Sequence, residues 1–378
     1  ALNEQTSFKV CLYSSNNIYI KLDCKAPSGW ETIIRRVGYV PMLHRNTGSH
    51  HSRHDIEGKG LIPGYVPDPL FNEDEFLLPA NETHSFWITI KPSSNAIPGN
   101  YKIKTNIYPQ NGKPIKHCAN IRLFDIYLKK RENFPITQWF YVDAIMDWYK
   151  ASSITDPKLW KIIPLYFKDM ANHAQNGVLV PCFTPPTDGV KRPTQLLFVK
   201  KLKNNRYEFN WSLVKRYMKL ASACGIEYFE WNHFFTQWGA KYAIRIYEKH
   251  GENEKLLWTP QTPATSDIYR IFLKQFIPQL HAFLSKEKWL SKTFFHLSDE
   301  PHGPEHMRNY RAARNMLRKI APWMKVMDAL TSIDFAKQNL VDMPIPNIQT
   351  ALDFIKNNIE CWCYYCCGPR GSYLNRLM

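Results

Sequence analysis

The first third of the chain alternates short apolar runs with polar positions and turn residues. Pro, Gly and Asn separate the runs, of which the clearest cover residues 8–12, 18–22, 86–90, 101–107 and 121–128. A period of two is typical of half-buried strands, and many short strands between turns are typical of two packed sheets. We therefore expect residues 1–133 to form an N-terminal β-sandwich domain.

After residue 134, strand-like apolar runs alternate with longer amphipathic stretches. Expected strands cover residues 139–144, 177–183, 227–235, 293–298, 325–330, 341–345 and 361–366, and expected helices cover 157–173, 211–224, 267–284 and 304–320. Repeated βα units predict a parallel sheet, so the expected fold class is multi-domain, β then α/β, with a (β/α)₈-type TIM barrel over residues 134–378. A closed barrel has eight strands, and seven can be counted. We expect the barrel to be incomplete at its C-terminal end.

Composition and charge narrow the class of protein. The chain is 44% hydrophobic, and no run of eighteen uncharged apolar residues occurs, so we expect a globular protein without a membrane span. The formal net charge of +16 invites a nucleic-acid partner. The Lys and Arg residues are scattered along the chain, however, so we expect no nucleic-acid binding.

Two clusters of metal-ligand residue types occur. Cys361, Cys363, Cys366 and Cys367 lie in an apolar aromatic run without a second cysteine or histidine pair, and a histidine-rich stretch covers residues 50–54. The cysteine run reads as a buried strand, and the histidines read as a solvated loop. We therefore expect neither a metal site nor a cofactor.

Polar and aromatic side chains gather where the expected barrel strands end, which is where barrels place their working residues. The aromatic rings suit the C–H face of a sugar, and the carboxylate and amide groups suit its hydroxyls. The candidate substrate-binding residues are Asp143, Glu230, Asn232, His233, Trp238, Tyr364 and Tyr365.

The sharpest feature is a pair of adjacent carboxylates, Asp299 and Glu300, which ends an apolar strand and is followed by Pro301. Neighbours on a regular strand face opposite sides, but at a strand end the chain can turn so that both face one pocket. Repulsion between two close carboxyl groups moves their pKa values apart, which leaves one group protonated as an acid and the other ionised. The alternative is an ordinary turn in which Asp299 caps the next helix.

Five blocks of sequence, taken in order, resemble glycoside hydrolase family 123. They are Trp139–Asp143, Phe183–Pro186, Tyr228–Lys241, His296–Pro301 and Tyr364–Arg370, and Pro63–Leu70 also looks like the leading β-sandwich of that family. The resemblance covers nearly the whole chain. Relatives continue into an eighth strand, so the resemblance implies a chain truncated within the catalytic barrel.

The resemblance implies a β-N-acetylgalactosaminidase that removes terminal β-linked N-acetylgalactosamine from glycans or glycoconjugates. The family's mechanism is retaining, and the substrate's own 2-acetamido oxygen acts as nucleophile through an oxazoline. The catalytic pair falls on Asp299, which would orient the acetamide, and Glu300, which would act as acid and base. A bacterial protein of this kind is expected to be secreted or periplasmic. The polar N-terminus carries no signal peptide, so we expect that the leader has been removed.

Two other functions stay open at this point. One is a related enzyme that cleaves β-linked N-acetylglucosamine or acts inside a glycan, because the sequence does not reveal which side chains meet the 4-hydroxyl. The other is a carbohydrate-binding protein without turnover. The intact pair of Asp299 and Glu300 favours an enzyme.

Overall fold

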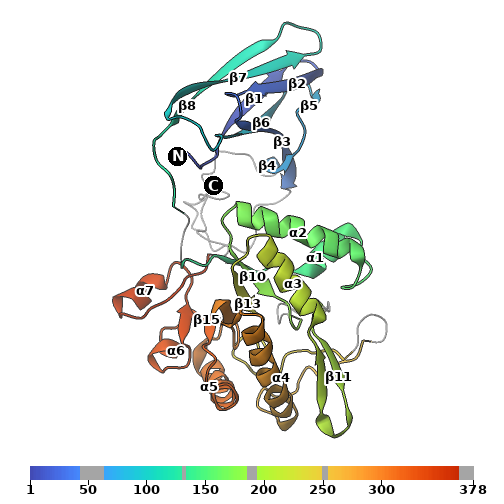
Figure 1. The fold of residues 1–378 in the computed structure, drawn as a ribbon, viewed down its shortest axis with the longest axis vertical. Helices are drawn as coiled ribbons and strands as arrows, with labels where there is room; N and C mark the ends of the chain where they lie inside the picture. Colours follow the sequence, from blue (N-terminus) through green and yellow to red (C-terminus); the bar gives the residue numbers. More distant parts are fainter. Residues whose placement is uncertain (43–63, 130–132, 185–193, 249–253, 366–378) are drawn as a thin grey trace. The chain divides into compact units, whose positions relative to one another are not determined.

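The computed structural model describes residues 1–42, 64–129, 133–184, 194–248 and 254–365. They belong to two compact units, the first within Ala1–Glu132 and the second within Asn133–Cys366 (Figure 1). The first unit contains the strands β1 (Thr6–Ser14), β2 (Ile18–Lys25), β3 (Glu31–Met42), β4 (Gly64–Phe71), β5 (Glu75–Leu78), β6 (Glu82–Lys91), β7 (Gly99–Pro109) and β8 (Ile115–Leu123).

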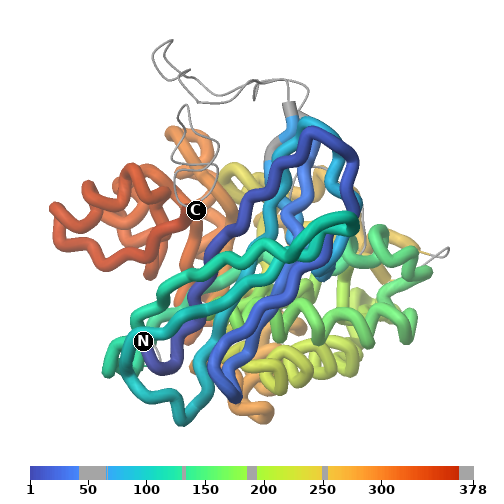
Figure 2. Tube along the Cα trace, turned by 90° about the horizontal axis from the view of Figure 1, so that it is seen from above, coloured from blue at the N-terminus to red at the C-terminus, as the bar shows by residue number. Residues whose placement is uncertain are grey.

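The strands of the first unit form two four-stranded antiparallel sheets, ordered β1-β6-β3-β4 and β5-β2-β7-β8. In Figure 2 these long strands, coloured blue to teal, run alongside one another. Both sheets contribute buried side chains to one apolar cluster, including Val10 and Phe86 from the first sheet and Leu22 and Ile103 from the second. The arrangement is that of two sheets packed around a shared core, and the prediction of an N-terminal β-rich region is confirmed.

Some details of the first unit differ from the prediction. The apolar run expected at 121–128 is a strand only as far as Leu123, where β8 ends. The strands β3, β4 and β5 were not predicted. In β3 the pair Arg35 and Arg36 and the nearby Gly38 interrupt the apolar alternation, and β5 is only four residues long.

The second unit begins with a parallel sheet ordered β14-β13-β10-β9. Its strands are β9 (Thr137–Gln138), β10 (Gly177–Val180), β13 (Tyr228–Trp231) and β14 (Thr293–Phe295), followed by the parallel pair β15 (Met327–Ala329) and β16 (Met343–Ile345). Isolated parallel bridges link Phe295 with Val326 and Asn347 with Tyr364, so the same order continues past β14 and β16. Over the described residues these strands form no closed barrel, and the TIM barrel stays a prediction.

Helices follow the strands as the sequence pattern predicts. They are α1 (Val142–Tyr149), α2 (Pro157–Asn172), α3 (Ser212–Ala223), α4 (Asp267–Lys286), α5 (Gly303–Ile320), α6 (Asp334–Lys337) and α7 (Ala351–Lys356), with a hairpin of β11 (Phe198–Lys201) and β12 (Tyr207–Asn210) between β10 and α3. The four predicted helices are confirmed, with ends that agree within two residues. None of the helices within the described ranges has the length and apolarity needed to cross a membrane.

Two predicted strands are wrong in part. The strand expected at 139–144 ends earlier, at Gln138, because Val142, Ile145 and Tyr149 follow the helical spacing and form α1, with Val142 and Ile145 buried. The strand expected at 361–366 makes only the isolated bridge at Tyr364. Cys363 is exposed rather than buried, and Cys366, Cys367 and the histidines at 50–54 lie outside the described residues.

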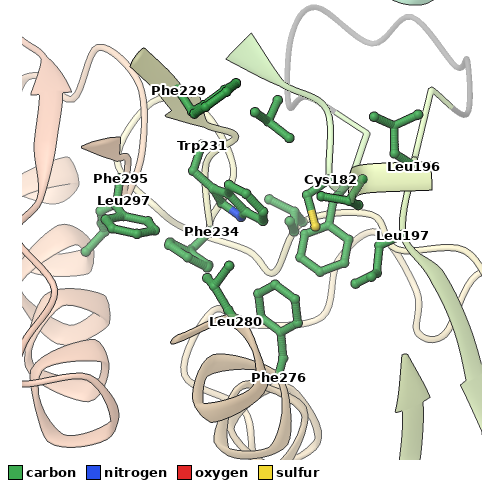
Figure 3. Packing of buried hydrophobic residues seen from close by; sticks show 14 of the residues in the cluster. Cys182, Leu196, Leu197, Phe229, Trp231, Phe234, Phe276, Leu280, Phe295 and Leu297 are labelled. Carbon is green, nitrogen blue, oxygen red and sulfur yellow. The ribbon is translucent and has the colours of Figure 1, made fainter. Parts of the chain in front are cut away.

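Alternate residues of β13 and β14 pack toward the helices. Figure 3 shows Phe229 and Trp231 of β13 in the same buried cluster as Phe276 of α4, with Phe295 and Leu297 from β14 and its end beside them. Successive side chains of a strand point to opposite faces. Glu230 on β13 and His296 just after β14 therefore point away from this apolar layer, and the candidate site is built on that second face.

Candidate active site

Three ionisable side chains on neighbouring strands form a buried network. Trp139 Nε1 donates to Glu230 Oε1 at 2.6 Å, and His296 Nε2 lies 2.6 Å from the same Glu230 oxygen. On its other side, His296 Nδ1 lies 3.2 Å from Asp328 Oδ1. Glu230, His296 and Asp328 are 3%, 1% and 0% exposed. The network ties β13, the end of β14 and β15 together, and His296 precedes the predicted catalytic pair by three residues.

The charges of this network support one another. Burial lowers the pKa of His296, but the charges and hydrogen bonds of Glu230 and Asp328 outweigh it and raise that pKa to about 10. Burial raises the pKa of Glu230, but the His296 charge and the hydrogen bonds of His296, Thr137 and Trp139 together outweigh it, so the pKa lies below its ordinary value. Burial holds the pKa of Asp328 above its ordinary value, although the His296 and Tyr310 hydrogen bonds oppose the shift.

Asp328 also fixes the backbone that leads to the carboxylate pair. Its oxygens accept hydrogen bonds from the backbone N–H of Leu297 at 2.9 Å and of Ser298 at 3.3 Å, and from the hydroxyl of Tyr310. The segment before Asp299 is therefore held from the neighbouring strand β15.

Asp299 lies in a buried, partly polar environment. It is 5% exposed, and its Oδ2 accepts a hydrogen bond from Gln237 Nε2 at 2.9 Å. Burial and the neighbouring Glu300 charge raise the pKa of Asp299 to about 7. The helix-cap alternative for Asp299 is wrong, because α5 begins at Gly303 and His302 occupies its N-cap position.

Glu300 points into a different environment from its neighbour. Its backbone is left-handed, with φ of 44°, and its N–H donates to the carbonyl of Ala329 at 3.0 Å. Its side chain is exposed, and Oε1 accepts a hydrogen bond from the Tyr364 hydroxyl at 3.0 Å. A left-handed backbone is uncommon outside Gly and Asn, so its presence at this position marks a turn that gives the two carboxylates unlike surroundings.

The loop after β13 reaches back to the pair. Trp238 is 52% exposed, and its backbone N–H donates to the carbonyl of Asp299 at 2.7 Å. The Ala240 N–H donates to Ser298 Oγ at 3.1 Å. Gly239 has φ of 95°, and a Cβ there would lie 2.4 Å from the Cβ of His306, so only glycine fits. The loop thus places Gln237 and Trp238 beside Asp299.

The remaining expected binding residues divide into buried and more exposed ones. His233 is buried between the rings of Trp139 and His296, at centroid distances of 5.4 and 4.7 Å, and burial holds its pKa well below the ordinary value. Asn232 is buried as well, and its amide bonds the Phe183 N–H and the His233 carbonyl. The Asn232 amide is therefore satisfied inside the protein, whereas both ring nitrogens of His233 are buried without a hydrogen-bond partner in the described part of the chain.

Asp143 and Tyr365 are less closely connected with the pair. Asp143 lies in the first turn of α1, and its Oδ1 is buried with no hydrogen-bond partner in the described part of the chain. Tyr365 is 46% exposed and directly follows Tyr364. Over the described residues, neither forms a hydrogen bond with Asp299 or Glu300.

Three residues of this site were not among the expected binding residues: Gln237, His296 and Asp328. His296 interrupts the apolar run at 294–297, and carboxylates occur at the ends of the strands on either side of it. A histidine in such a place is a signal for a buried ion pair. Its partners could be named only once the strand order was known.

A metal would find three suitable residues here, since ligand atoms of His233, His296 and Asp328 lie within 4.8 Å of one another. Both ring nitrogens of His296, however, already face carboxylate oxygens. A ring protonated between these two carboxylates has no nitrogen lone pair to offer a cation, so the arrangement favours an ion-pair network over a metal centre.

Comparison with known proteins decides the family. Residues 139–378 match the model of the glycoside hydrolase 123 catalytic domain. The chain belongs to glycoside hydrolase family 123. The resemblance carried by the five sequence blocks is confirmed, and the family makes this chain a glycoside hydrolase by class.

Solved structures agree on the fold. A family 123 glycoside hydrolase from Clostridium perfringens, described in terms of glycolipid glycan hydrolysis, superposes with a TM-score of 0.73 at 16% identity, covering 97% of this chain and 67% of that chain. A Bacteroides ovatus GH5 xyloglucanase is far less similar, with a TM-score of 0.30 at 9% identity over 96% of this chain and 69% of that chain. No curated protein matches the chain.

Proposed function

We propose that this family 123 member removes terminal β-linked N-acetylgalactosamine by retaining, substrate-assisted hydrolysis at Asp299 and Glu300. The observation that carries the proposal is the contrast within the pair. Asp299 is buried with its pKa raised to about 7, and Glu300 is exposed on a left-handed turn beside Tyr364. Adjacent carboxyl groups in unlike surroundings suit the two different roles that this mechanism needs.

In the first step, Glu300 donates a proton to the glycosidic oxygen. The acetamido oxygen of the substrate attacks C1, and the C1–O bond breaks with its electron pair going to the leaving oxygen. Positive charge develops on the resulting oxazoline ring. Ionised Asp299, which faces the acetamido N–H in this proposal, orients the group and stabilises that charge.

In the second step, Glu300 acts as a base and removes a proton from water. The water oxygen attacks C1 from the face that the leaving group vacated, and the C1–O bond of the oxazoline breaks to restore the acetamide. Two inversions at C1 give net retention of the β configuration. No protein nucleophile is required, because the substrate supplies it.

The surroundings of the pair support these roles. Gln237 donates to one oxygen of Asp299, and Tyr364 donates to one oxygen of Glu300, so each carboxylate is oriented by a neutral partner. Trp238, whose backbone N–H binds the Asp299 carbonyl, has a half-exposed aromatic side chain of the kind that packs against a sugar ring. We include Trp238, Tyr364 and Tyr365 as substrate contacts and Asp143, Glu230, Asn232 and His233 as inner residues of the site.

The proposal extends to the fold and setting of the enzyme. The parallel strand order supports a (β/α)₈ barrel that continues past the described strands. The structure of the Clostridium perfringens relative concerns glycolipid glycan hydrolysis, so a glycolipid headgroup is our first candidate glycoconjugate. A secreted or periplasmic location in a bacterium would give access to such a substrate.

The test compares 4-nitrophenyl glycosides that differ only at C2. We expect hydrolysis of the β-N-acetylgalactosaminide and no detectable hydrolysis of the plain β-galactoside, because the acetamido group is the nucleophile. Comparable turnover of both would exclude the mechanism. The matching β-N-acetylglucosaminide distinguishes the two epimers at C4, and binding without turnover of any of the three would support a carbohydrate-binding protein.

A further inference from the structure

We infer that His296 is a positioning residue: a buried imidazolium that holds the segment before Asp299 and favours the ionised form of that carboxyl group. The catalytic consequence of this inference rests on the proposed function. The ionisation of His296 and Asp299 does not, and can be measured without any substrate.

The position of the ring between two buried carboxylates favours a protonated ring. His296 Nε2 faces Glu230 Oε1 at 2.6 Å, and Nδ1 faces Asp328 Oδ1 at 3.2 Å. A neutral imidazole has one N–H, so it can donate to only one of two carboxylates, whereas the imidazolium donates to both. The carboxylates are buried with the ring, and an unpaired charge would be costly in such a place. A cation between two anions is the arrangement that satisfies all three groups.

His296 acts on Asp299 first through position. Asp328, which His296 contacts, also accepts from the backbone N–H groups of Leu297 and Ser298. Ser298 is followed directly by Asp299, and the Ser298 hydroxyl donates to the carbonyl of Thr236 at 2.7 Å. The His296 imidazolium therefore holds the Asp328 carboxylate in place, and Asp328 in turn holds the backbone before Asp299.

His296 acts on Asp299 also through charge. The charged groups whose fields act on Asp299 are Glu300, His296 and Asp328, and Gln237 adds a neutral hydrogen bond. Burial and the charges of Glu300 and Asp328 raise the pKa of Asp299, while His296 is the one charged group among them that lowers it. Ionised Asp299 is the form that the proposed mechanism uses, and His296 makes it accessible near neutral pH.

His233 completes the surroundings of His296. Its ring lies 4.7 Å from the His296 ring, and burial together with the His296 charge keeps it neutral. It adds no second positive charge to the network. The inference therefore concerns His296 alone, with Glu230 and Asp328 as its two counter-charges.

The experiment follows His296 and Asp299 by NMR in the full chain, labelled at histidine nitrogens and aspartate carboxyl carbons. We expect the His296 ring to carry both protons at pH 8 and the Asp299 carboxyl to titrate near pH 7. In His296→Gln the Asp299 midpoint should rise by about one pH unit, as expected for loss of a nearby opposite charge. Tyr310→Phe is the matched control, because it removes a hydrogen bond that Asp328 accepts but removes no charge. The pH midpoint of Asp299 should be the same in this variant as in the unmodified protein.

A second variant keeps the test decisive if His296→Gln fails to fold. In Glu230→Gln the His296 ring loses one counter-charge, so its titration should move to lower pH. A His296 ring that titrates at or below pH 6.5 in the unmodified protein would overturn the inference, and so would an Asp299 midpoint that stays unchanged in folded His296→Gln.

A kinetic measurement separates positioning from a purely structural role. With 4-nitrophenyl β-N-acetylgalactosaminide, His296→Gln should lose about tenfold in kcat/KM at pH 6, with most of the loss recovered where Asp299 is fully ionised. An equal loss at every pH would show that His296 only maintains structure. If the unmodified enzyme has no activity, the proposed function fails, while the NMR titrations still decide the role of His296.

Discussion

The two units of the protein bury different kinds of polar side chains. In the described part of the first unit the buried polar side chains are hydroxyls, those of Ser85, Thr89 and Thr105. The second unit buries ionisable groups at its strand ends, and these include Glu230, His233, His296, Asp299 and Asp328. The core of the first unit is thus built for stability, and that of the second also holds charge.

The difference has a physical cause. A buried hydroxyl needs one nearby partner, such as the pair Ser7 Oγ and Thr89 Oγ1 at 3.0 Å. A buried ion costs several kcal/mol unless an opposite charge and hydrogen bonds compensate it. Ionisable groups are therefore concentrated where chemistry uses them. Substitutions in the two units should separate stability from activity.

The largest expected effect is on activity, from Asp299→Asn in the second unit. It removes the charge that the proposed oxazoline step needs, so kcat/KM should fall by about 10²- to 10⁴-fold on natural glycans and on nitrophenyl substrates alike. Stability should change in the opposite direction at high pH. The pKa of folded Asp299 lies above that of an unfolded Asp, so protonated Asp299 stabilises the unmodified protein fully below about pH 4, and this contribution is lost as pH rises through about 7. The variant should therefore be the more stable protein above that pH.

The neighbouring variant Glu300→Gln provides the contrast. It removes the proton donor, which a nitrophenolate leaving group scarcely needs, so the first step should be retained far better on nitrophenyl substrates than on glycans. Azide should partly restore turnover by attacking the oxazoline without a base. If Asp299→Asn shows the dependence on leaving group and Glu300→Gln is inactive on both substrates, the two roles are reversed. If neither substitution matters, the catalytic assignment fails.

The next effect is on stability, from Phe86→Ala in the first unit. Phe86 is completely buried in the core between the two sheets, so the unfolding free energy should fall by about 3–5 kcal/mol. Leu77→Ala is the control, because Leu77 is 56% exposed on β5 and should change stability by less than about 0.5 kcal/mol. Chemical denaturation measures both. A fall in kcat at temperatures where Phe86→Ala remains folded would show that the first unit also supports catalysis.

The hydrophobic pattern predicted much of the fold because it depends on local spacing. The helices α2, α3, α4 and α5 follow amphipathic stretches whose ends are visible in the sequence. The pattern failed where one short apolar run fits both the two-residue spacing of a strand and the 3.6-residue spacing of a helix, as in the segment that forms α1. It also failed at β3, where Arg35 and Arg36 conceal a strand that pairs on both sides.

The sequence predicted residues of the site but not the contacts between them. Asp299 and Glu300 stand out because they are adjacent, end an apolar run and precede a proline. The network around His296 depends on which strands are neighbours, since Glu230 lies 66 residues before His296 and Asp328 lies 32 residues after it. Nothing local in the sequence states that these three side chains meet.

A smaller effect concerns the pH dependence of activity. With the nitrophenyl substrate, kcat/KM should rise with pH through about 7, where Asp299 ionises. Gln237→Leu removes a hydrogen bond that favours the ionised form, so the rising limb should move to higher pH. Glu300→Gln removes a charge that disfavours it, so the limb should move to lower pH. If the rising limb of kcat/KM lies at the same pH in the unmodified enzyme, Gln237→Leu and Glu300→Gln, a group other than Asp299 controls the pH dependence.

The smallest effect should come from Tyr364→Phe at the exposed side of the pair. The substitution removes the hydroxyl that donates to Glu300 Oε1 at 3.0 Å, and a net hydrogen bond is worth about 1 kcal/mol, which is about fivefold in rate. The loss should appear in kcat on a natural glycan, where the orientation of the proton donor matters, and should be weaker on the nitrophenyl substrate. Tyr108→Phe is the matched control, because Tyr108 is an exposed tyrosine on β7 of the first unit and should leave both rates unchanged. Equal losses in the two variants would mean that the hydroxyl of Tyr364 has no specific action on Glu300. The contrast between the first unit and the second unit would then not extend to the exposed edge of the site.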